Sequence, residues 1–220
     1  MDLLTAFIDI VLHLDAQLLS LTQQYGVWVY AILFLIIYSE TGLVIAPFLP
    51  GDSLLFVAGA LCGMGALQLE WLVPLLVLAA FSGDNTNYWV GRLVGMSLLK
   101  RAGGKLIRRE HIDKTHAFYE KHGGKTVVLA RFLPIIRTFA PFVAGIGMMS
   151  YRKFMLFSAL GSVAWISSLT VAGYLFGNIP LVKNNLTLII VGIIVISLLP
   201  AISEFIRHRR IGAGKVLSED

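Results

Sequence analysis

The fold is decided by residues 129–147, LARFLPIIRTFAPFVAGIG, an apolar stretch that contains two arginines, Arg131 and Arg137. A guanidinium stays charged at physiological pH, and placing one in hydrocarbon costs about 2.5 kcal/mol or more on insertion scales. The same stretch contains three residues that interrupt helices, namely Pro134, Pro141 and Gly145. We therefore expect broken backbone here. At membrane depth such backbone is tolerated only where it is buried in protein or lines a wet cavity.

The composition indicates a polytopic membrane protein. The chain has 220 residues, of which 57% are hydrophobic and 14% charged, with a mean hydropathy of +0.79, whereas soluble domains carry about 25% charged residues. Its net charge is +5, but no Lys or Arg precedes Arg92, while eight lie between Lys100 and Lys125. This asymmetry is typical of a topology signal and argues against a nucleic-acid-binding face.

Hydropathy and turn residues divide a single membrane domain into eight segments. Residues 26–65 contain two apolar arms around a turn, and each arm is shorter than the roughly 20 residues that a crossing needs. Three residues break this first hairpin, Pro47, Pro50 and Gly51. The segments are an amphipathic interfacial helix (1–24), a re-entrant hairpin (26–65), a transmembrane helix (71–99), a cytoplasmic basic amphipathic segment (100–125), a second re-entrant hairpin (126–150), two transmembrane helices (154–177 and 186–206) and a cytoplasmic tail (207–220).

Positive charge sets the predicted orientation. With residues 100–125 in the cytoplasm, a re-entrant second hairpin returns Arg152 and Lys153 to the cytoplasm, and the tail ends there too. Every basic cluster then obeys the positive-inside rule. The first hairpin opens on the other face, so the two hairpins are opposed. The orientation of the N-terminal helix stays open.

Two short echoes favour an internal duplication. Residues 46–51 and 140–145 share A-P-F-x-x-G, and residues 91–95 and 173–177 share G-x-L-x-G in the same order. With opposed hairpins, the duplicated unit gives an inverted repeat, an architecture whose substrate site lies near the bilayer midplane. The predicted fold class is therefore an all-α polytopic membrane protein built as an inverted repeat.

Four charged residues are expected to meet where the two hairpins approach each other. The first hairpin contributes Glu40 and Asp52, and the second contributes Arg131 and Arg137. Pairing offsets the desolvation of both charges, and arginine suits a bidentate grip on phosphate. A buried carboxylate beside an arginine can also bind and release a proton. A purely structural salt bridge between the repeats is the alternative interpretation.

Four stretches are similar to a known family. They are residues 40–54 (ETGLVIAPFLPGDSL), 83–92 (GDNTNYWVGR), 118–125 (FYEKHGGK) and 131–145 (RFLPIIRTFAPFVAG). They resemble the DedA family of bacterial inner-membrane proteins, and the similarity extends over nearly the whole chain. The resemblance implies opposed re-entrant hairpins and flipping or scrambling of undecaprenyl phosphate or phospholipid, dependent on the proton-motive force. It also implies that the two acids and two arginines named above are the functional residues.

Asp84, Tyr88 and Arg92 give the predicted helix 71–99 a polar face, since they are four residues apart. For Asp84, local satisfaction within a packed helix and a place in a cavity wall are equally good interpretations. No histidine spacing matches a metal site, so we expect neither metal nor cofactor. The expected partners are lipids with a phosphate headgroup and protons, without nucleic acid. The oligomeric state stays open, with a homodimer as one option.

The leading functional hypothesis is a transporter of an anionic lipid phosphate, undecaprenyl phosphate first, in a bacterial inner membrane. Arg131 and Arg137 would bind the phosphate, and Glu40 and Asp52 would exchange protons. The alternatives are a phospholipid scramblase or flippase, for example for phosphatidylethanolamine, a proton-coupled small-ion transporter, and a scaffold with indirect envelope effects. An enzyme is not expected, because no intramembrane histidine lies beside the arginines and no GxSxG or HExxH run is present.

Overall fold

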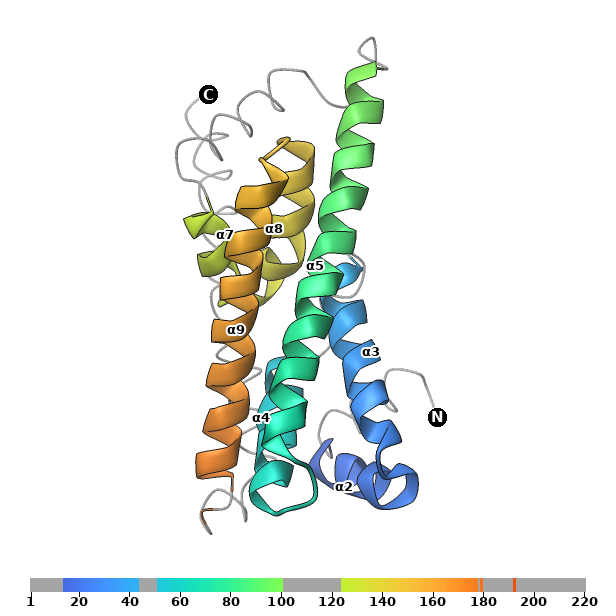
Figure 1. Ribbon diagram of the computed structural model, residues 1–220, viewed down its shortest axis with the longest axis vertical. Helices are drawn as coiled ribbons and strands as arrows, with labels where there is room; N and C mark the ends of the chain where they lie inside the picture. The colour runs from blue at the N-terminus through green and yellow to red at the C-terminus, as the bar shows by residue number, and fades with distance from the viewer. Residues whose placement is uncertain (1–13, 44–50, 101–123, 178, 180–191, 193–220) are drawn as a thin grey trace, which may run out of the picture.

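The computed structural model describes residues 14–43, 51–100, 124–177, 179 and 192. All regular elements in this part of the chain are α-helices, which confirms the prediction that the fold is all-α (Figure 1). They are α2 (Leu14–Tyr25), α3 (Trp28–Gly42), α4 (Gly51–Gly63), α5 (Leu69–Lys100), α7 (Lys125–Ala130), α8 (Pro134–Ile146) and α9 (Tyr151–Phe176). Several predictions lie outside the described residues: the turn prolines Pro47 and Pro50, most of the basic segment 100–125, the span 186–206 except Gly192, and the tail 207–220.

Two long antiparallel helices, α5 and α9, form the frame (Figure 1). At about 1.5 Å per residue, the 32 residues of α5 extend about 48 Å and the 26 residues of α9 about 39 Å. Among the described helices, α9 is the one whose length and apolar composition would let it cross a membrane, and it coincides with the predicted span 154–177. The predicted span 71–99 coincides with α5, whose middle contains a polar run at residues 84–87.

The shorter helices lie in opposite halves along this frame. In Figure 1, α3 rises and α4 descends in the lower half, whereas α8 rises through the upper half beside α7. The most extensive packing joins α4 to α9 and α8 to α5, and α3 also packs along α5. Helix α3 therefore ends, and helices α4 and α8 begin, near the middle of the frame (Figure 1).

The predicted break in residues 129–147 is narrower than expected. Residues 131–133 separate α7 from α8, and Pro134 begins α8 at the first helical position, where its missing N–H loses no helical hydrogen bond. The prediction that Pro141 and Gly145 also break the hairpin is wrong, since both lie inside α8. Pro141 removes one helical hydrogen bond, and the packing of α8 on α5 keeps the helix continuous. Gly51 begins α4, as expected for a residue at the end of a turn.

Helices α4 and α8 share more than their length of 13 residues. Both end with the same pair of backbone hydrogen bonds. At the end of α4, Gly65 N–H donates to the Cys62 carbonyl and Ala66 N–H to the Leu61 carbonyl. At the end of α8, Met148 N–H donates to the Gly145 carbonyl and Met149 N–H to the Ala144 carbonyl. In both caps one residue is in the left-handed region, Gly65 at φ 78° and Met148 at φ 54°. This is the Schellman pattern, which satisfies the last helical carbonyl groups.

Phe-Val-Ala-Gly occurs twice, at residues 56–59 on α4 and 142–145 on α8, and both copies mark a close helix crossing. In each crossing the glycine lies against a backbone carbonyl of a long helix, and a glycine of that helix lies against the phenylalanine carbonyl. The facing pairs are Phe56 with Gly173, Gly59 with Thr170, Phe142 with Gly91, and Gly145 with Tyr88.

The predicted A-P-F-x-x-G echo does not mark equivalent positions. Its first glycine, Gly51, begins α4, while its second, Gly145, lies next to the last residue of α8. The G-x-L-x-G echo does mark equivalent positions, because its first glycines, Gly91 and Gly173, occupy matching places in the two crossings. On the short helices, the residues that match in the A-P-F-x-x-G pattern are therefore not the residues that occupy equivalent positions in the structure.

The described helices are apolar outside and charged inside. Large aliphatic side chains are exposed along the outer faces of several helices, for example Leu35, Leu78, Leu93, Leu156 and Leu175. In contrast, Glu40, Asp84, Arg131 and Arg137 are buried. A soluble protein shows the reverse distribution. The arrangement is that of a protein surrounded by lipid.

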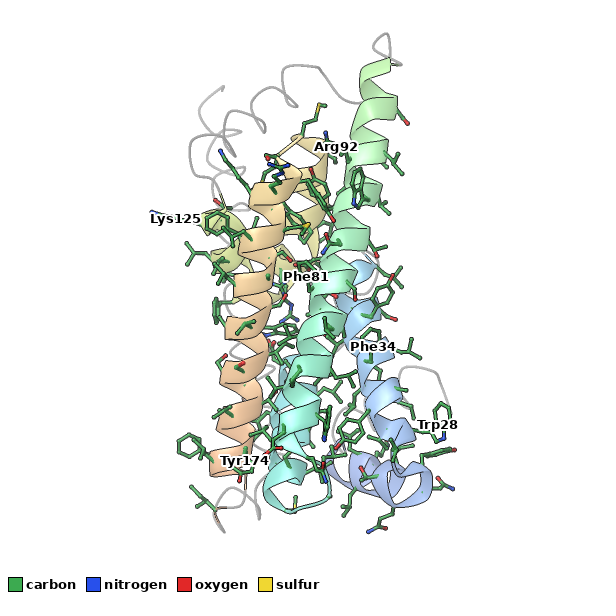
Figure 2. The ribbon with its side chains drawn as sticks, viewed as in Figure 1. Trp28, Phe34, Phe81, Arg92, Lys125 and Tyr174 are labelled. Atoms are coloured by element: carbon green, nitrogen blue, oxygen red, sulfur yellow. The ribbon has the colours of Figure 1, made fainter. Side chains whose placement is uncertain are left out.

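Described basic residues outside the core gather at one end of the molecule. Figure 2 shows Arg92 and Lys125 toward the upper end, where α9 also begins with the exposed Arg152 and Lys153. Trp28 and Tyr174 lie toward the lower end, where α2, α3, α4 and residues 154–176 of α9 contain no Lys or Arg. The two ends therefore differ in charge.

Candidate functional site

Charged side chains meet where the short helices break. Glu40 lies in the last turn of α3 and Asp52 in the first turn of α4. Arg131 follows α7, Arg137 is the fourth residue of α8, and Asp84 lies in the middle of α5. All are buried except the Asp52 side chain, which is 18% exposed. Residues up to 97 positions apart in the chain thus form one buried cluster.

Arg137 joins α8 to both α3 and α4. Its Nη1 donates to Asp52 Oδ1 at 2.6 Å, and its Nη2 donates to Glu40 Oε1. The predicted pairing of these two acids with an arginine is therefore present. Neither Glu40, near the negative end of the α3 dipole, nor Arg137, near the positive end of the α8 dipole, is favoured by its own helix. Their mutual pairing offsets that cost.

Trp165 of α9 completes the surroundings of Arg137. The guanidinium carbon lies 4.2 Å from the centre of the indole ring, and Trp165 Nε1 donates to Asp52 Oδ1 at 2.9 Å. Desolvated cation–π contacts of this kind stabilise by about 2 kcal/mol. Arg137 thereby contacts side chains from three other helices.

Arg131 has a different partner from the one predicted. Its Nη2 donates to Asp84 Oδ2, and Ser158 Oγ of α9 donates to the same oxygen at 2.6 Å. The expectation that both arginines face Glu40 and Asp52 is therefore wrong for Arg131. Asp84 is satisfied by a residue 47 positions later, and not within its own helix. The signal was available, because Asp84 is a third acid within an apolar segment.

The predicted grouping of Asp84 with Tyr88 and Arg92 divides into two sites. Tyr88 donates to the Met149 carbonyl at 2.5 Å, and Arg92 Nη1 donates to Tyr88 Oη at 2.7 Å. Tyr88 also stacks on Phe154, with ring centres 4.5 Å apart. Tyr88 and Arg92 therefore belong to an aromatic cluster one turn or more beyond Asp84, nearer the basic end.

Three polar residues of the site carried no sequence signal that singled them out. Asn87 Nδ2 donates to the carbonyls of Thr41 at 3.1 Å and Thr138 at 2.7 Å, so it links α3 to α8 through α5. The other two are Ser158 and Trp165. A neutral amide, a hydroxyl and an indole within apolar helices have many structural uses, and only their partners reveal which one applies.

The two arginines differ in how fully their donors are used. Arg131 Nε and Nη1 are buried and have no hydrogen-bond partner in the described part of the chain, whereas on Arg137 this holds for Nε alone. Buried donors in native proteins are usually paired. Arg131 therefore retains capacity to bind an acceptor.

A cavity of about 640 Å³ lies elsewhere, at the turns between α2 and α3 and between α4 and α5. Its lining includes Tyr30, Leu67 and Trp71, and none of the five clustered charges. No group of three or more potential metal ligands occurs among the described residues.

A helical bundle with an apolar exterior and buried ion pairs defines a membrane protein with a charged interior. Residues 49–175 match the VTT domain. The chain is 57% identical to Protein DedA of Escherichia coli K12 over 215 residues, covering 97% of this chain and 98% of that one. It therefore belongs to the DedA family, as the sequence motifs indicated.

More distant relatives are also named as membrane proteins. An uncharacterized membrane protein of Mycobacterium leprae is 44% identical over 76% of this chain and 75% of its own length. The inner membrane protein YqjA of Escherichia coli K12 is 31% identical over 82% and 81%, respectively. No solved structure matches the chain.

Proposed function

We propose that this protein transports a lipid with an anionic phosphate headgroup across a bacterial inner membrane, without hydrolysing it. The observation that carries the proposal is a pair of buried arginines at the ends of broken helices, with unused donors at Arg131 Nε and Nη1 and at Arg137 Nε. Guanidinium groups match phosphate geometry, and ionisable residues inside a membrane mark substrate or proton pathways by default.

The proposed architecture is an inverted repeat with two opposed re-entrant hairpins. Helices α4 and α8, at about 20 Å each, are too short for a hydrocarbon core of about 30 Å. Their matching caps and matching Phe-Val-Ala-Gly crossings support a duplicated unit. The end with Arg92, Lys125, Arg152 and Lys153 would face the cytoplasm.

The helix ends favour an anion at the cluster. Both α4 and α8 begin there, and the N-terminus of a helix carries a partial positive charge. Discontinuous helices of transporters direct such N-termini at anionic substrate groups. The lipid tails would stay in the membrane while the headgroup passes between the two faces.

Protons balance the charge in this mechanism. When all five groups are ionised, three carboxylates face two guanidiniums, which leaves one negative charge in excess. A phosphate adds to that excess in a medium where unpaired charge is costly. Protonation of Glu40 or Asp52 would compensate, and it would link transport to the proton gradient. Undecaprenyl phosphate is the proposed lipid.

Flux in reconstituted vesicles tests the proposal. A fluorescent prenyl phosphate in the inner leaflet should become accessible to an external quencher with the wild-type protein and with Arg152→Ala, which alters an exposed arginine. Arg131→Ala should lose the flux. Equal flux from Arg131→Ala, or flux of a neutral prenyl alcohol at the same rate, would exclude phosphate transport by this site. Release of inorganic phosphate would indicate an enzyme.

A further inference from the structure

We propose that the two arginines have different roles: Arg131 is the phosphate ligand, Asp84 is the counter-ion that the phosphate displaces, and Arg137 holds the helix ends together. This division deepens the proposed function and rests on it. Sequence alone gives both arginines the same status, since they share one apolar stretch.

Both Nη atoms of Arg137 are already committed, and only its Nε has no partner among the described residues. Its two Nη atoms bind separate carboxylates, Glu40 on α3 and Asp52 on α4, and its flat face stacks on Trp165 of α9. Releasing it would leave two carboxylates without a cation and separate four helices from one another. Breaking a buried ion pair in this way is strongly destabilising. Arg137 is therefore suited to assembly of the site.

Arg131 is bound through a single nitrogen. Asp84 accepts from Nη2 alone, while Nε and Nη1 remain buried without a partner in the described residues. A phosphate has several acceptor oxygens around one centre, so it can use Nη2 together with a second nitrogen of the fork. Asp84 Oδ2 therefore pairs with only one of the three guanidinium nitrogens of Arg131, and the other two can donate to a phosphate.

Ser158 shows where the phosphate oxygen would lie. Its hydroxyl donates to Asp84 Oδ2 at 2.6 Å, and Arg131 Nη2 donates to the same atom. Two donors from different segments therefore converge on one anionic oxygen. The Asp84 carboxylate occupies the position of a phosphate oxygen in the absence of lipid, and it returns to Arg131 when the lipid leaves.

Gly161 provides the space that this arginine needs. A Cβ at Gly161 would lie 2.8 Å from Arg131 Cδ and 2.9 Å from Arg131 Nε, closer than side chains tolerate. The unpartnered Nε therefore faces the backbone of α9 at close range. A small movement of α9 would open that edge of the guanidinium, while the Asp84 contact on Nη2 is exchanged for phosphate.

Binding of dodecyl phosphate to the purified full-length protein tests the division. Trp165 lies 6.0 Å from the Arg131 guanidinium and can report binding by fluorescence once Trp28, Trp71 and Trp89 are replaced by Phe. Asp84→Asn removes the competing charge and should tighten binding about tenfold or more, within the coupling range of close charge pairs. Asp52→Asn is the matched comparison, because it removes the same charge from Arg137; it mimics a protonated Asp52 and should therefore tighten binding as well, but by less than Asp84→Asn.

Equal gains from both variants would show that total charge alone matters and would overturn the role of Asp84. Arg131→Lys should weaken binding about tenfold or more while the melting temperature stays near that of the wild type, since Lys lacks the fork. Arg137→Lys should instead lower the melting temperature. The reverse pattern would overturn the division, even if Asp84→Asn fails to fold.

Two further results separate this inference from the proposed function. If neither the wild type nor Asp84→Asn binds dodecyl phosphate, the proposed function fails and the division fails with it. If the wild type binds and the larger gain appears at Asp52→Asn, only the division fails. Binding of inorganic phosphate is measured in the same way. If it binds as tightly as dodecyl phosphate, the ligand of the site is a free anion and not a lipid.

Discussion

At the scale of single residues, the proposed function is concentrated in charged side chains that are buried. Arg131, Arg137, Glu40 and Asp84 are each at most 4% exposed, yet they come from four separate segments. Their residue types could be predicted as important from their position in apolar sequence. Their pairing could not, because the match of Arg131 with Asp84 depends on how α5 is rotated.

Trp165 gives a prediction at this scale. Trp165→Phe keeps an aromatic face for Arg137 and loses the bond to Asp52, so we expect a loss of about 1 kcal/mol in unfolding free energy. Trp165→Leu also loses the cation–π contact and should cost about 3 kcal/mol. Thermal unfolding in detergent measures both. Trp89→Leu, at a half-exposed site, is the control, and an equal loss there would contradict the role assigned to Trp165.

At the scale of helices, the sequence predicted breaks around Gly51 and over residues 129–147. Gly51 and Pro134 begin helices, whereas the second break was predicted to extend too far. Pro141 lies within a helix because packing against α5 outweighs one lost hydrogen bond. Gly145 is required for contact between helices and not for a turn. The repeated Phe-Val-Ala-Gly sequence is visible without the structure, but only the structure shows that both copies lie at close helix crossings.

The two crossings should respond alike to substitution. A Cβ at Gly59 would overlap the Thr170 carbonyl, and one at Gly145 would overlap the Tyr88 carbonyl. We expect Gly59→Ala and Gly145→Ala each to lower the unfolding free energy by about 1–3 kcal/mol, since helix backbones must separate. Ala31→Ser, at an exposed position of α3, is the control for adding one atom. Strongly unequal losses would contradict equivalence of the crossings.

At the scale of the whole molecule, the buried charge makes anion binding sensitive to pH. The groups involved are Glu40, Asp52, Asp84, Arg131 and Arg137, with one negative charge in excess before any ligand binds. A second negative charge is admitted most easily with a proton. Binding of an anionic lipid should therefore strengthen as the pH falls.

Didecyl phosphate is the appropriate probe for this effect, because a phosphate diester keeps a single negative charge near neutral pH. We expect its affinity for the purified protein to rise by up to about tenfold per pH unit between pH 8 and pH 6, which is the slope for uptake of one proton. Calorimetry in two buffers of different ionisation enthalpy also counts the protons. A constant affinity with no proton uptake would exclude proton coupling through this cluster.

Native mass spectrometry tests most directly whether a buried arginine binds the phosphate of a membrane lipid. The wild-type protein, purified gently from membranes, should retain a prenyl phosphate or another anionic phospholipid as a discrete adduct. Arg131→Ala should lose that adduct while Arg152→Ala keeps it. The same adduct on Arg131→Ala, or the absence of any phosphate lipid from the wild type, would contradict a lipid-phosphate site at Arg131.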